Sequence, residues 1–311
     1  MRIAVFGTGG IGGYIGGRLV AGEDVVFVAR GKTLEALRTG GLRVDSIAGD
    51  FTVPRVQAVE GTEHAGTFDV VLLCVKAWQV ADAARALSPM LGAASCVLPL
   101  QNGVEAPAIL AAELTREKVL GGLCSLMAYV IAPGHVRHAG GEPFVKFGEL
   151  GNHRSERVVR IHRAFERAHG LAVEIAPDID AAMWEKFLFI AAWGGVGSVA
   201  RAPVGIIRTQ PGTRKMLQQA MMEIVNVAKA RGVDVPPDAP ATALDLMGGM
   251  PDDATASMQR DIMAGMPSEL EAQTGAVVRL GREAGVETPI NALIYASLLP
   301  RELHARRQLH W

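Results

Sequence analysis

The first half of the chain alternates short apolar runs with amphipathic stretches. Four runs of five or six residues are rich in valine and nearly all apolar, and they predict strands at 2–6, 25–29, 70–75 and 96–100. Strands that are apolar on both faces are typical of a parallel sheet with helices on both sides. We therefore expect βαβ units wound on a mostly parallel sheet.

The pattern changes twice further along the chain. Between Gly121 and Gly148, the pairs Pro133-Gly134 and Gly140-Gly141 predict antiparallel hairpins that close the first domain. From about residue 178, apolar residues recur at helical spacing and predict helices at 213–231, 252–264, 267–284 and 289–299. The predicted fold is α/β, with an N-terminal Rossmann-type doubly wound sheet over 1–178 and an all-α domain over 179–311.

Composition narrows the class of partner. The 311 residues are 49% apolar with a mean hydropathy of +0.22, which is enough to bury a large core and excludes a mainly disordered chain. The 31 basic and 32 acidic residues give a net charge of −1, which supplies no field for holding a nucleic acid. A small-molecule partner is expected.

The expected location follows from three further observations. The longest weakly polar run, 187–200, is shorter than the roughly 20 residues that span a bilayer, so we expect no membrane partner. The N-terminus lacks the continuous apolar centre of a secretory signal. The three cysteines, Cys74, Cys96 and Cys124, are widely spaced in apolar runs and predict reduced core thiols in a cytoplasmic protein.

Seven of the 36 glycines fall between residues 7 and 17 and form a G-x-G-x-x-G pattern. The pattern follows a predicted strand and opens a predicted helix, which is the context of a dinucleotide-binding turn. Gly7 permits the tight turn, Gly9 lets the backbone approach a pyrophosphate, and Gly12 allows close helix packing. The predicted cofactor-binding residues of the turn are Gly7, Gly9, Gly10, Ile11 and Gly12. The alternative is a glycine-rich turn that binds nothing.

The end of the second predicted strand indicates which dinucleotide is used. An acidic residue there accepts from a ribose 2′-hydroxyl, whereas a basic one pairs with a 2′-phosphate. Arg30 occupies this place with Lys32 nearby, and no Asp or Glu lies between residues 25 and 34. We therefore predict NADP, the alternative being that Arg30 is an ordinary exposed arginine.

Polar side chains follow two other predicted strands. Lys76 ends the run 70–75, and Asn102 follows the run 96–100. The carboxyl edge of a doubly wound sheet is where ligands bind, so both are candidate site residues. Asn102 precedes a glycine, and an Asn-Gly turn without a ligand explains it equally well.

Three residues of the second half could carry chemistry. Lys186 lies between large apolar side chains at the start of a helix, where apolar surroundings would favour proton transfer. The alternative is a lysine that extends from the helix into water. Glu269 follows Pro267 on the first turn of a predicted helix and could simply be favoured by the helix dipole. Ser257 could be an ordinary helix residue.

Together these residues resemble the ketopantoate reductase (2-dehydropantoate 2-reductase) family, within the broader 6-phosphogluconate-dehydrogenase-like group. The resemblance covers nearly the whole chain. Its motifs are the glycine turn, Arg30-Gly31, Val75-Lys76, Leu100-Gln101-Asn102-Gly103, Pro133-Gly134 with His138, Trp184-Glu185-Lys186, Ser257-Met258 with Asp261 and Gly265, Glu269, Gly275 and Pro289.

The resemblance implies an enzyme that uses NADPH to reduce a 2-oxo acid to a 2-hydroxy acid, with 2-dehydropantoate reduced to pantoate in pantothenate biosynthesis as the first expectation. It implies that Lys186 is the general acid and that Glu269 holds that lysine and the substrate. It implies that Ser257 binds the substrate carboxylate and that Asn102 lines both the nicotinamide and the substrate. Arg30 and Lys76 would serve the cofactor phosphates.

The chain departs from the family at two positions. Members of the family carry asparagines four and eight residues after the catalytic lysine, where this chain has Ile190 and Gly194. A pocket without those amides would leave a substrate hydroxyl unpaired. We therefore hypothesise that the chemistry is retained on a more apolar 2-oxo acid. The alternatives are a related dehydrogenase that oxidises a hydroxy acid, or a regulatory protein that binds NADP without catalysis.

Two further expectations concern ligands and assembly. His135 and His138 are three apart in a predicted hairpin and should point to opposite faces, so we expect no metal site. Apolar residues of the last predicted helix, including Leu293 and Leu298, could pack internally or against a second subunit, which leaves a homodimer open.

Overall fold

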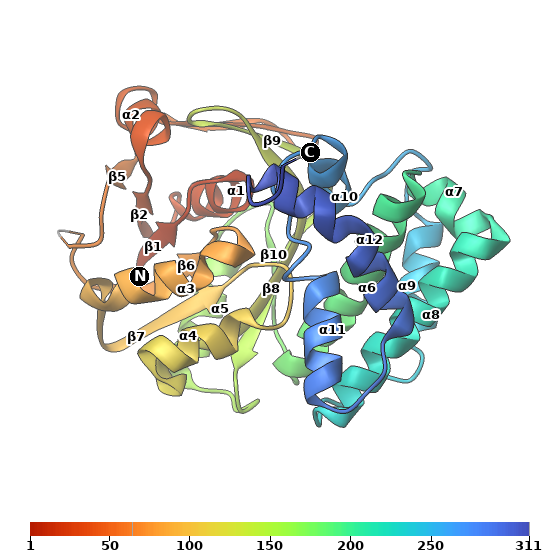
Figure 1. Ribbon diagram of the computed structural model, residues 1–311. Helices are drawn as coiled ribbons and strands as arrows, with labels where there is room; N and C mark the ends of the chain where they lie inside the picture. Colours follow the sequence, from red (N-terminus) through yellow and green to blue (C-terminus); the bar gives the residue numbers. More distant parts are fainter. Residues whose placement is uncertain (64, 311) are drawn as a thin grey trace. The chain divides into compact units, whose positions relative to one another are not determined.

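The structure is a computed structural model that describes residues 1–63 and 65–310. The chain groups into two compact units (Figure 1). Unit 1 contains Met1–Gln101 and Ala106–Ile179, and unit 2 contains Asn102–Glu105 and the chain from Asp180 onward. The chain therefore passes from one unit to the other at 101/102, at 105/106 and at 179/180.

Unit 1 is built on a parallel sheet of five strands. They are β1 (Arg2–Phe6), β2 (Asp24–Val28), β5 (Gln57–Val59), β6 (Phe68–Leu73) and β7 (Leu91–Pro99), in the order β5-β2-β1-β6-β7. The strands are added outward from β1 in both directions, so the predicted doubly wound fold is confirmed. The bounds of three predicted strands were wrong: β2 is Asp24–Val28 rather than 25–29, β6 is Phe68–Leu73 rather than 70–75, and β7 is Leu91–Pro99 rather than 96–100.

Helices cover both faces of this sheet. The helices of unit 1 are α1 (Gly10–Leu19), α2 (Gly31–Gly40), α3 (Val80–Leu87), α4 (Ala106–Leu114) and α5 (Glu156–Glu166), with short 3₁₀ turns η1 (Ala77–Gln79), η2 (Ser88–Met90) and η3 (Arg116–Lys118). Alternate strand residues join different cores: Val71 packs with α3 and α4, whereas Val70 packs with α1 and α5. Burial on both faces explains why the strands are almost entirely apolar.

A second sheet completes unit 1. Its strands are β3 (Leu42–Ser46), β4 (Phe51–Val53), β8 (Leu120–Ala132), β9 (His135–Glu149) and β10 (Ala172–Ile175), and β8 pairs with β9 beside the path β10-β9-β3-β4. The predicted hairpins are in fact one long hairpin that turns at Pro133-Gly134. Gly140 and Gly141 lie within β9, where the pairing register shifts and Gly141 has a φ of +74°. They form an irregularity in a strand rather than a second turn.

Helix α1 lies between the two sheets, and its glycines lie on both of its faces. A Cβ at Gly16 would lie 2.6 Å from the Phe27 ring in the first sheet. A Cβ at Gly13 would lie 2.7 Å from Val136 in the second sheet. The close packing that the sequence predicts at Gly12 thus continues at Gly16, whereas the contact of Gly13 with the second sheet was not predicted. Much of the glycine surplus therefore has a packing origin.

Unit 2 contains helices and no strand among its described residues. Its helices are α6 (Ile179–Ala200), whose first residue belongs to unit 1, then α7 (Val204–Thr209), α8 (Pro211–Ala230), α9 (Ala239–Gly248), α10 (Ser257–Met263), α11 (Thr274–Glu283) and α12 (Pro289–Ala305). Their apolar faces meet in one core that includes Phe187, Leu217, Met221 and Ile294. The predicted all-α second half is confirmed.

Each of the four helices predicted in unit 2 has at least one wrong bound, and α8 is Pro211–Ala230 rather than 213–231. Helix α10 begins at Ser257 rather than 252, because the carbonyls of Asp252 and Ala254 accept hydrogen bonds from the start of α7. Helix α11 begins at Thr274 rather than 267, and α12 continues to Ala305 rather than ending at 299. Over the described part of the chain, we find no helix that has both the length and the apolar character needed to cross a bilayer.

Candidate active site

The glycine turn joins β1 to α1 in unit 1. Gly7 has a φ of +100°, and a Cβ there would lie 2.9 Å from the backbone nitrogen of Val75, so only glycine fits. Gly9 is the extended N-cap residue of α1, and no side chain caps the helix. The N–H groups of residues 10–12 lie in the first turn of α1, where a helix offers no internal acceptors. The predicted phosphate-binding residues thus present backbone donors.

The space around this turn suits a dinucleotide. A Cβ at Gly9 would meet nothing within 4 Å, whereas a Cβ at Gly12 would lie 2.2 Å from the carbonyl oxygen of Gly7. The turn is therefore open at Gly9 and closely packed at Gly12. The first turn of α1 contains no acidic side chain that would repel an anion. An open approach and helix N–H groups are what a pyrophosphate requires.

The two predicted phosphate-binding cations follow the strands that flank β1. Arg30 is the exposed N-cap residue of α2, just after β2. Lys76 is exposed and begins η1 after β6, with Nζ 5.7 Å from the centroid of the Trp78 ring. The prediction that Lys76 ends its strand directly was wrong by two residues, because β6 stops at Leu73. Both cations still lie at the carboxyl edge of the sheet, as the glycine turn does.

Gln101 is a supporting residue that sequence reasoning missed. Its buried side chain donates to the carbonyl oxygens of Leu73 at 2.7 Å and Val75 at 3.0 Å. These bonds fix the segment between β6 and Lys76. A glutamine between an apolar strand and Asn-Gly was the available signal, because a polar side chain at the end of a buried strand needs a partner.

Lys186 lies on α6 in unit 2. It is the eighth residue of the helix and is half-buried, so the prediction that it lies at the start of the helix was wrong. Its neighbours Trp184 and Phe187 are buried and meet edge to face, with ring centroids 5.6 Å apart. The rigid aromatic packing around the lysine fixes the helix turn that carries it.

Three predicted site residues form one chain of hydrogen bonds. Lys186 Nζ donates to Asn102 Oδ1 at 2.9 Å, and Asn102 Nδ2 donates to Glu269 Oε2 at 3.1 Å. Lys186 lies 84 residues after Asn102 and 83 residues before Glu269 in the sequence, and all three belong to unit 2. A side chain that ends in an ammonium is thereby connected to a buried carboxylate through an amide that both donates and accepts.

Glu269 has a different setting from the predicted one. It lies in a turn before α11, not on the first turn of that helix. The preceding Ser268 donates both its N–H and its hydroxyl to the carboxylate of Glu302, and its hydroxyl accepts from the Leu270 N–H. These bonds hold the chain in a non-helical path, so helix dipole stabilisation of Glu269 was a wrong expectation. The carboxylate is only 6% exposed and is held by side-chain amides instead.

The two positions where this chain departs from the family lie on the same helix as Lys186. Ile190 is half-buried and Gly194 is buried. A Cβ at Gly194 would lie 3.1 Å from Met258 Cε and 3.3 Å from Gln273 Oε1. The Gln273 side chain, 2% exposed, also places Nε2 3.5 Å from Glu269 Oε2. Gln273 was missed from the sequence, although its spacing of four from Glu269 was a signal.

An aromatic pair continues the α6 face that begins at Lys186. Phe189 and Trp193, three and seven residues after the lysine, have ring centroids 5.5 Å apart. The indole N–H of Trp193 is buried, and the described residues offer it no acceptor. Residues three, four, seven and eight apart share one side of a helix. This side of α6 therefore carries Lys186, two aromatic rings and no amide.

Ser257 is exposed as the first residue of α10 and is not part of the hydrogen-bonded chain. His135 and His138 have separate partners: His135 pairs with Asp45 at 2.9 Å, and His138 contacts Ser46 Oγ at 2.9 Å. Within 1–63 and 65–310, no group of three or more His, Cys, Asp or Glu residues could hold a metal ion.

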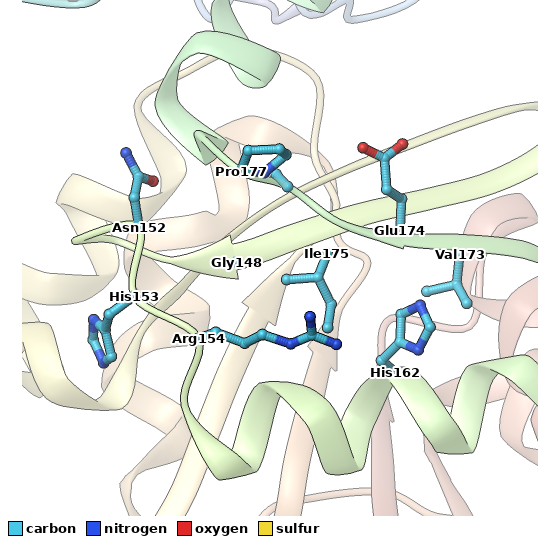
Figure 2. Close-up of a pocket in the computed structure, with 10 residues that line it drawn as sticks. Gly148, Asn152, His153, Arg154, His162, Val173, Glu174, Ile175 and Pro177 are labelled. Carbon is cyan, nitrogen blue, oxygen red and sulfur yellow. The ribbon is translucent and has the colours of Figure 1, made fainter.

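One open cavity of about 450 Å³ lies in unit 1, between α5, β10 and the end of β9 (Figure 2). In Figure 2, Arg154 and His162 lie on the side of β10 to which Ile175 points, whereas Glu174 points to the other side. Glu174 instead pairs with Lys146 at 3.0 Å. None of the predicted site residues lines this cavity, so we do not place the chemistry there.

Two of the cysteines, Cys74 and Cys96, have thiols whose reactivity is reduced by burial. Burial raises the pKa of Cys96 to about 12 and also raises the pKa of Cys74. A thiol in this state is a poor nucleophile at neutral pH. The lysine, amide and carboxylate of unit 2 are therefore the candidate groups for chemistry.

Comparisons with known proteins agree across the whole chain. The family model "Ketopantoate reductase PanE/ApbA" matches residues 3–152, and its C-terminal counterpart matches residues 178–302. The chain is 30% identical to an uncharacterized oxidoreductase, YkpB, of Bacillus subtilis, over 96% of this chain and 98% of that one. It is 31% identical to a 2-dehydropantoate 2-reductase of a Nostoc species, over 94% and 93% of the two chains. The crystal structure of a PanE/ApbA family ketopantoate reductase from Ralstonia eutropha superposes with a TM-score of 0.89 at 29% identity, covering 98% of this chain and 100% of that one.

Proposed function

The chain belongs to the ketopantoate reductase family of oxidoreductases, and from that premise we propose that it reduces a 2-oxo acid to a 2-hydroxy acid with NADPH. The observation that carries the proposal is the hydrogen-bonded chain of Lys186, Asn102 and Glu269. A binding protein has no need for a proton donor held in this way. The family resemblance and the side-chain geometry support the same chemistry.

The residues of unit 2 divide the work of proton transfer. NADPH, when bound, supplies the hydride to the carbonyl carbon. Negative charge then develops on the carbonyl oxygen, and Lys186 Nζ donates the proton that neutralises it. Asn102 Oδ1 accepts from Nζ at 2.9 Å and so orients the ammonium. Glu269 in turn holds the Asn102 amide, and Ser257 is assigned to the substrate carboxylate.

Residues 1–178 are proposed to hold the cofactor, and residues 179–311, together with Asn102, to hold the substrate and the catalytic groups. The turn formed by Gly7, Gly9 and residues 10–12 would hold the pyrophosphate. Arg30 and Lys76, both exposed after strands that flank β1, would hold further phosphates, including a 2′-phosphate. The Arg30→Glu variant tests this: its preference for NADPH over NADH should fall by about a hundredfold in kcat/KM if Arg30 pairs with the 2′-phosphate. An unchanged ratio would contradict the assignment.

For the substrate, we propose 2-dehydropantoate first, since the chain is similar over its length to reductases named for it. A more apolar 2-oxo acid is the second candidate. It is favoured by Ile190 and Gly194, which offer no amide to a substrate hydroxyl, and by the rings of Phe189 and Trp193 on the same side of α6.

The deciding experiment is NADPH oxidation by the purified full chain with a panel of 2-oxo acids. The panel includes 2-dehydropantoate, its analogue without the hydroxyl, and acids with larger apolar side chains. A strong preference for 2-dehydropantoate would reject the apolar alternative, and the reverse order would reject the pantoate assignment. Turnover of no member would reject reductase activity and favour an NADP-binding regulatory role. Cytoplasmic location and a homodimer stay predictions.

A further inference from the structure

Two short segments of unit 2 lie against each other and supply two of the proposed site residues. Segment 102–105 carries Asn102, and segment 269–273 carries Glu269. Gly103 has a φ of +99°, and a Cβ there would lie 2.8 Å from the carbonyl oxygen of Ala272. The two backbones are therefore in direct contact, and a side chain at position 103 would separate them.

One arginine contacts both segments. Arg279, on α11, donates to the Glu105 carboxylate through Nη2 at 2.6 Å and Nε at 3.3 Å. The same Nη2 lies 3.5 Å from the carbonyl oxygen of Glu271. The Glu105 contact is bidentate, which fixes orientation as well as distance. A single side chain thus ties the segment of Asn102 to the segment of Glu269.

The surroundings keep this arginine charged and in place. Burial alone would lower the pKa of Arg279, but the Glu105 carboxylate outweighs burial and the pKa is raised. Segment 269–273 is held from a second direction, because the Tyr295 hydroxyl donates to Glu271 at 2.5 Å. Burial, together with this bond, raises the pKa of Tyr295 to about 12, so the hydroxyl stays a donor.

Resting on the proposed function, we propose that Arg279 is a positioning residue for the reductase, acting through Glu105. It sets the distance between Asn102 and Glu269, and therefore the position of the ammonium that Asn102 holds. Its side chain belongs to neither the chain of hydrogen bonds at Lys186 nor the glycine turn. Its contribution is geometric, and small displacements of catalytic groups cost rate disproportionately.

The test is a double-mutant cycle with a matched control. Arg279→Gln and Glu105→Gln should each lower kcat roughly tenfold and leave the KM for NADPH unchanged, and the double variant should be no worse than either single one. Arg231 and Glu283 form the control pair: they are 3.1 Å apart, involve the same helix α11, and Arg231 is 37% exposed against 36% for Arg279. Arg231→Gln should leave kcat unchanged.

Hydrogen–deuterium exchange gives a readout that does not depend on turnover. In Arg279→Gln, segments 102–105 and 269–273 should exchange faster than in the wild type, and in Arg231→Gln they should not. Wild-type chain that reduces no 2-oxo acid would reject the proposed function and leave this exchange test intact. Wild-type kcat in Arg279→Gln, additive losses in the cycle, or unchanged exchange would overturn the positioning role. If Arg279→Gln does not fold, Arg279→Lys keeps the charge without the fork, and the same comparisons apply.

Discussion

Unit 1 and unit 2 prepare their proposed ligand contacts by different means. In unit 1, the glycine turn offers backbone N–H groups. The turn requires glycine at positions 7 and 12, because a Cβ at either position would clash with neighbouring backbone. In unit 2, the contacts are side chains joined by hydrogen bonds over distances of more than 80 residues in the sequence.

This difference explains why the glycine turn of unit 1 can be predicted from the sequence and the hydrogen-bonded side chains of unit 2 cannot. Steric constraints on a turn are local, so they leave a compact pattern of glycines. A hydrogen-bonded chain of side chains depends on residues that folding brings together, so it leaves isolated lysines, amides and carboxylates. Such residues become meaningful in the sequence only through a family resemblance.

Removing the Lys186 ammonium tests the proposed role of the side chains in unit 2, and we expect it to have the largest effect of the changes described here. Lys186→Ala should lower kcat for 2-oxo acid reduction about 1,000-fold, because the developing oxyanion loses its proton donor. NADPH affinity, measured by fluorescence titration, should be unchanged, since the glycine turn belongs to unit 1. Lys229→Ala, an exposed lysine on α8, is the matched control and should keep wild-type kcat. Retained turnover in Lys186→Ala would show that the Lys186 ammonium is not the proton donor.

Substitutions at two glycines of the turn in unit 1 test whether each glycine serves packing or the approach of the cofactor. Gly12→Ala should lower the free energy of unfolding by roughly 3 kcal/mol, because its Cβ would lie 2.2 Å from the Gly7 carbonyl oxygen. Gly9→Ala meets no protein atom within 4 Å, so thermal unfolding should be unchanged while the Kd for NADPH rises roughly tenfold. Equal effects of the two variants on stability would contradict the distinction between packing and ligand approach.

Unit 1 also contains a buried ion pair that serves stability instead of chemistry. Glu149, at the end of β9 and 4% exposed, accepts from Ser155 Oγ at 2.5 Å and from Arg157 Nε at 2.7 Å. Burial alone would raise the pKa of Glu149, but Arg157 and Ser155 outweigh it and the pKa is lowered. Glu149→Gln should reduce the free energy of unfolding by roughly 2 kcal/mol at neutral pH without changing kcat.

The pH dependence of stability follows from the sign of that shift. A carboxyl group with a lowered folded-state pKa contributes stability that is fully present above its unfolded-state value, about 4.3, and is lost as pH falls through the folded-state value. Denaturant unfolding of the wild type between about pH 5 and 2 should therefore show a steeper loss than Glu149→Gln. Glu174→Gln, which removes an exposed partner of Lys146, is the control. Parallel pH curves for wild type and Glu149→Gln would reject this account.

A substitution at Gly194 tests how tightly the side chains of the unit 2 site are packed, and we expect it to have a smaller effect than the changes above. Gly194→Asn alone should lower kcat/KM roughly fivefold, because its Cβ would crowd Met258 and Gln273 at 3.1 and 3.3 Å. The double variant Gly194→Asn with Gln273→Ala removes the Gln273 part of that crowding, leaves the Met258 contact, and should regain part of the loss. It should also shift preference toward a 2-oxo acid with a hydroxyl, since an amide returns to α6. No recovery in the double variant would mean that Gln273 does not occupy the space.

Much of unit 1 could be predicted because its constraints are local. The glycine turn, four of the five strands of the first sheet and Arg30 after β2 follow from residues close together in the sequence. The β8–β9 hairpin of the second sheet could be predicted from Pro133-Gly134, but the rest of that sheet could not, because β3 pairs with β9, about 90 residues away, and no local pattern indicates that pairing. The same long-range pairing turned Gly140-Gly141 from a predicted turn into an irregularity within β9.

In unit 2, helices were predictable but their starts were not. The path before α11 depends on Glu302, which binds Ser268 from 34 residues away. The placement of Asn102 with the helical half depends on Glu269 and Arg279, which lie more than 160 residues later. Glu105 has no local signal at all, since a surface glutamate in a loop is ordinary until its arginine is known.

The three passages of the chain between the units bear on how this protein could be divided. A gene fragment that encodes residues 180–311 would contain all of α11 but not segment 102–105, so Arg279 would lose its Glu105 partner and Glu269 its Asn102 donor. The unit is compact in space but discontinuous in the gene. If the chain were cut at 179/180 and the two halves coexpressed, segment 102–105 would lie on the first half. The helical unit would therefore be complete only when the two halves associate.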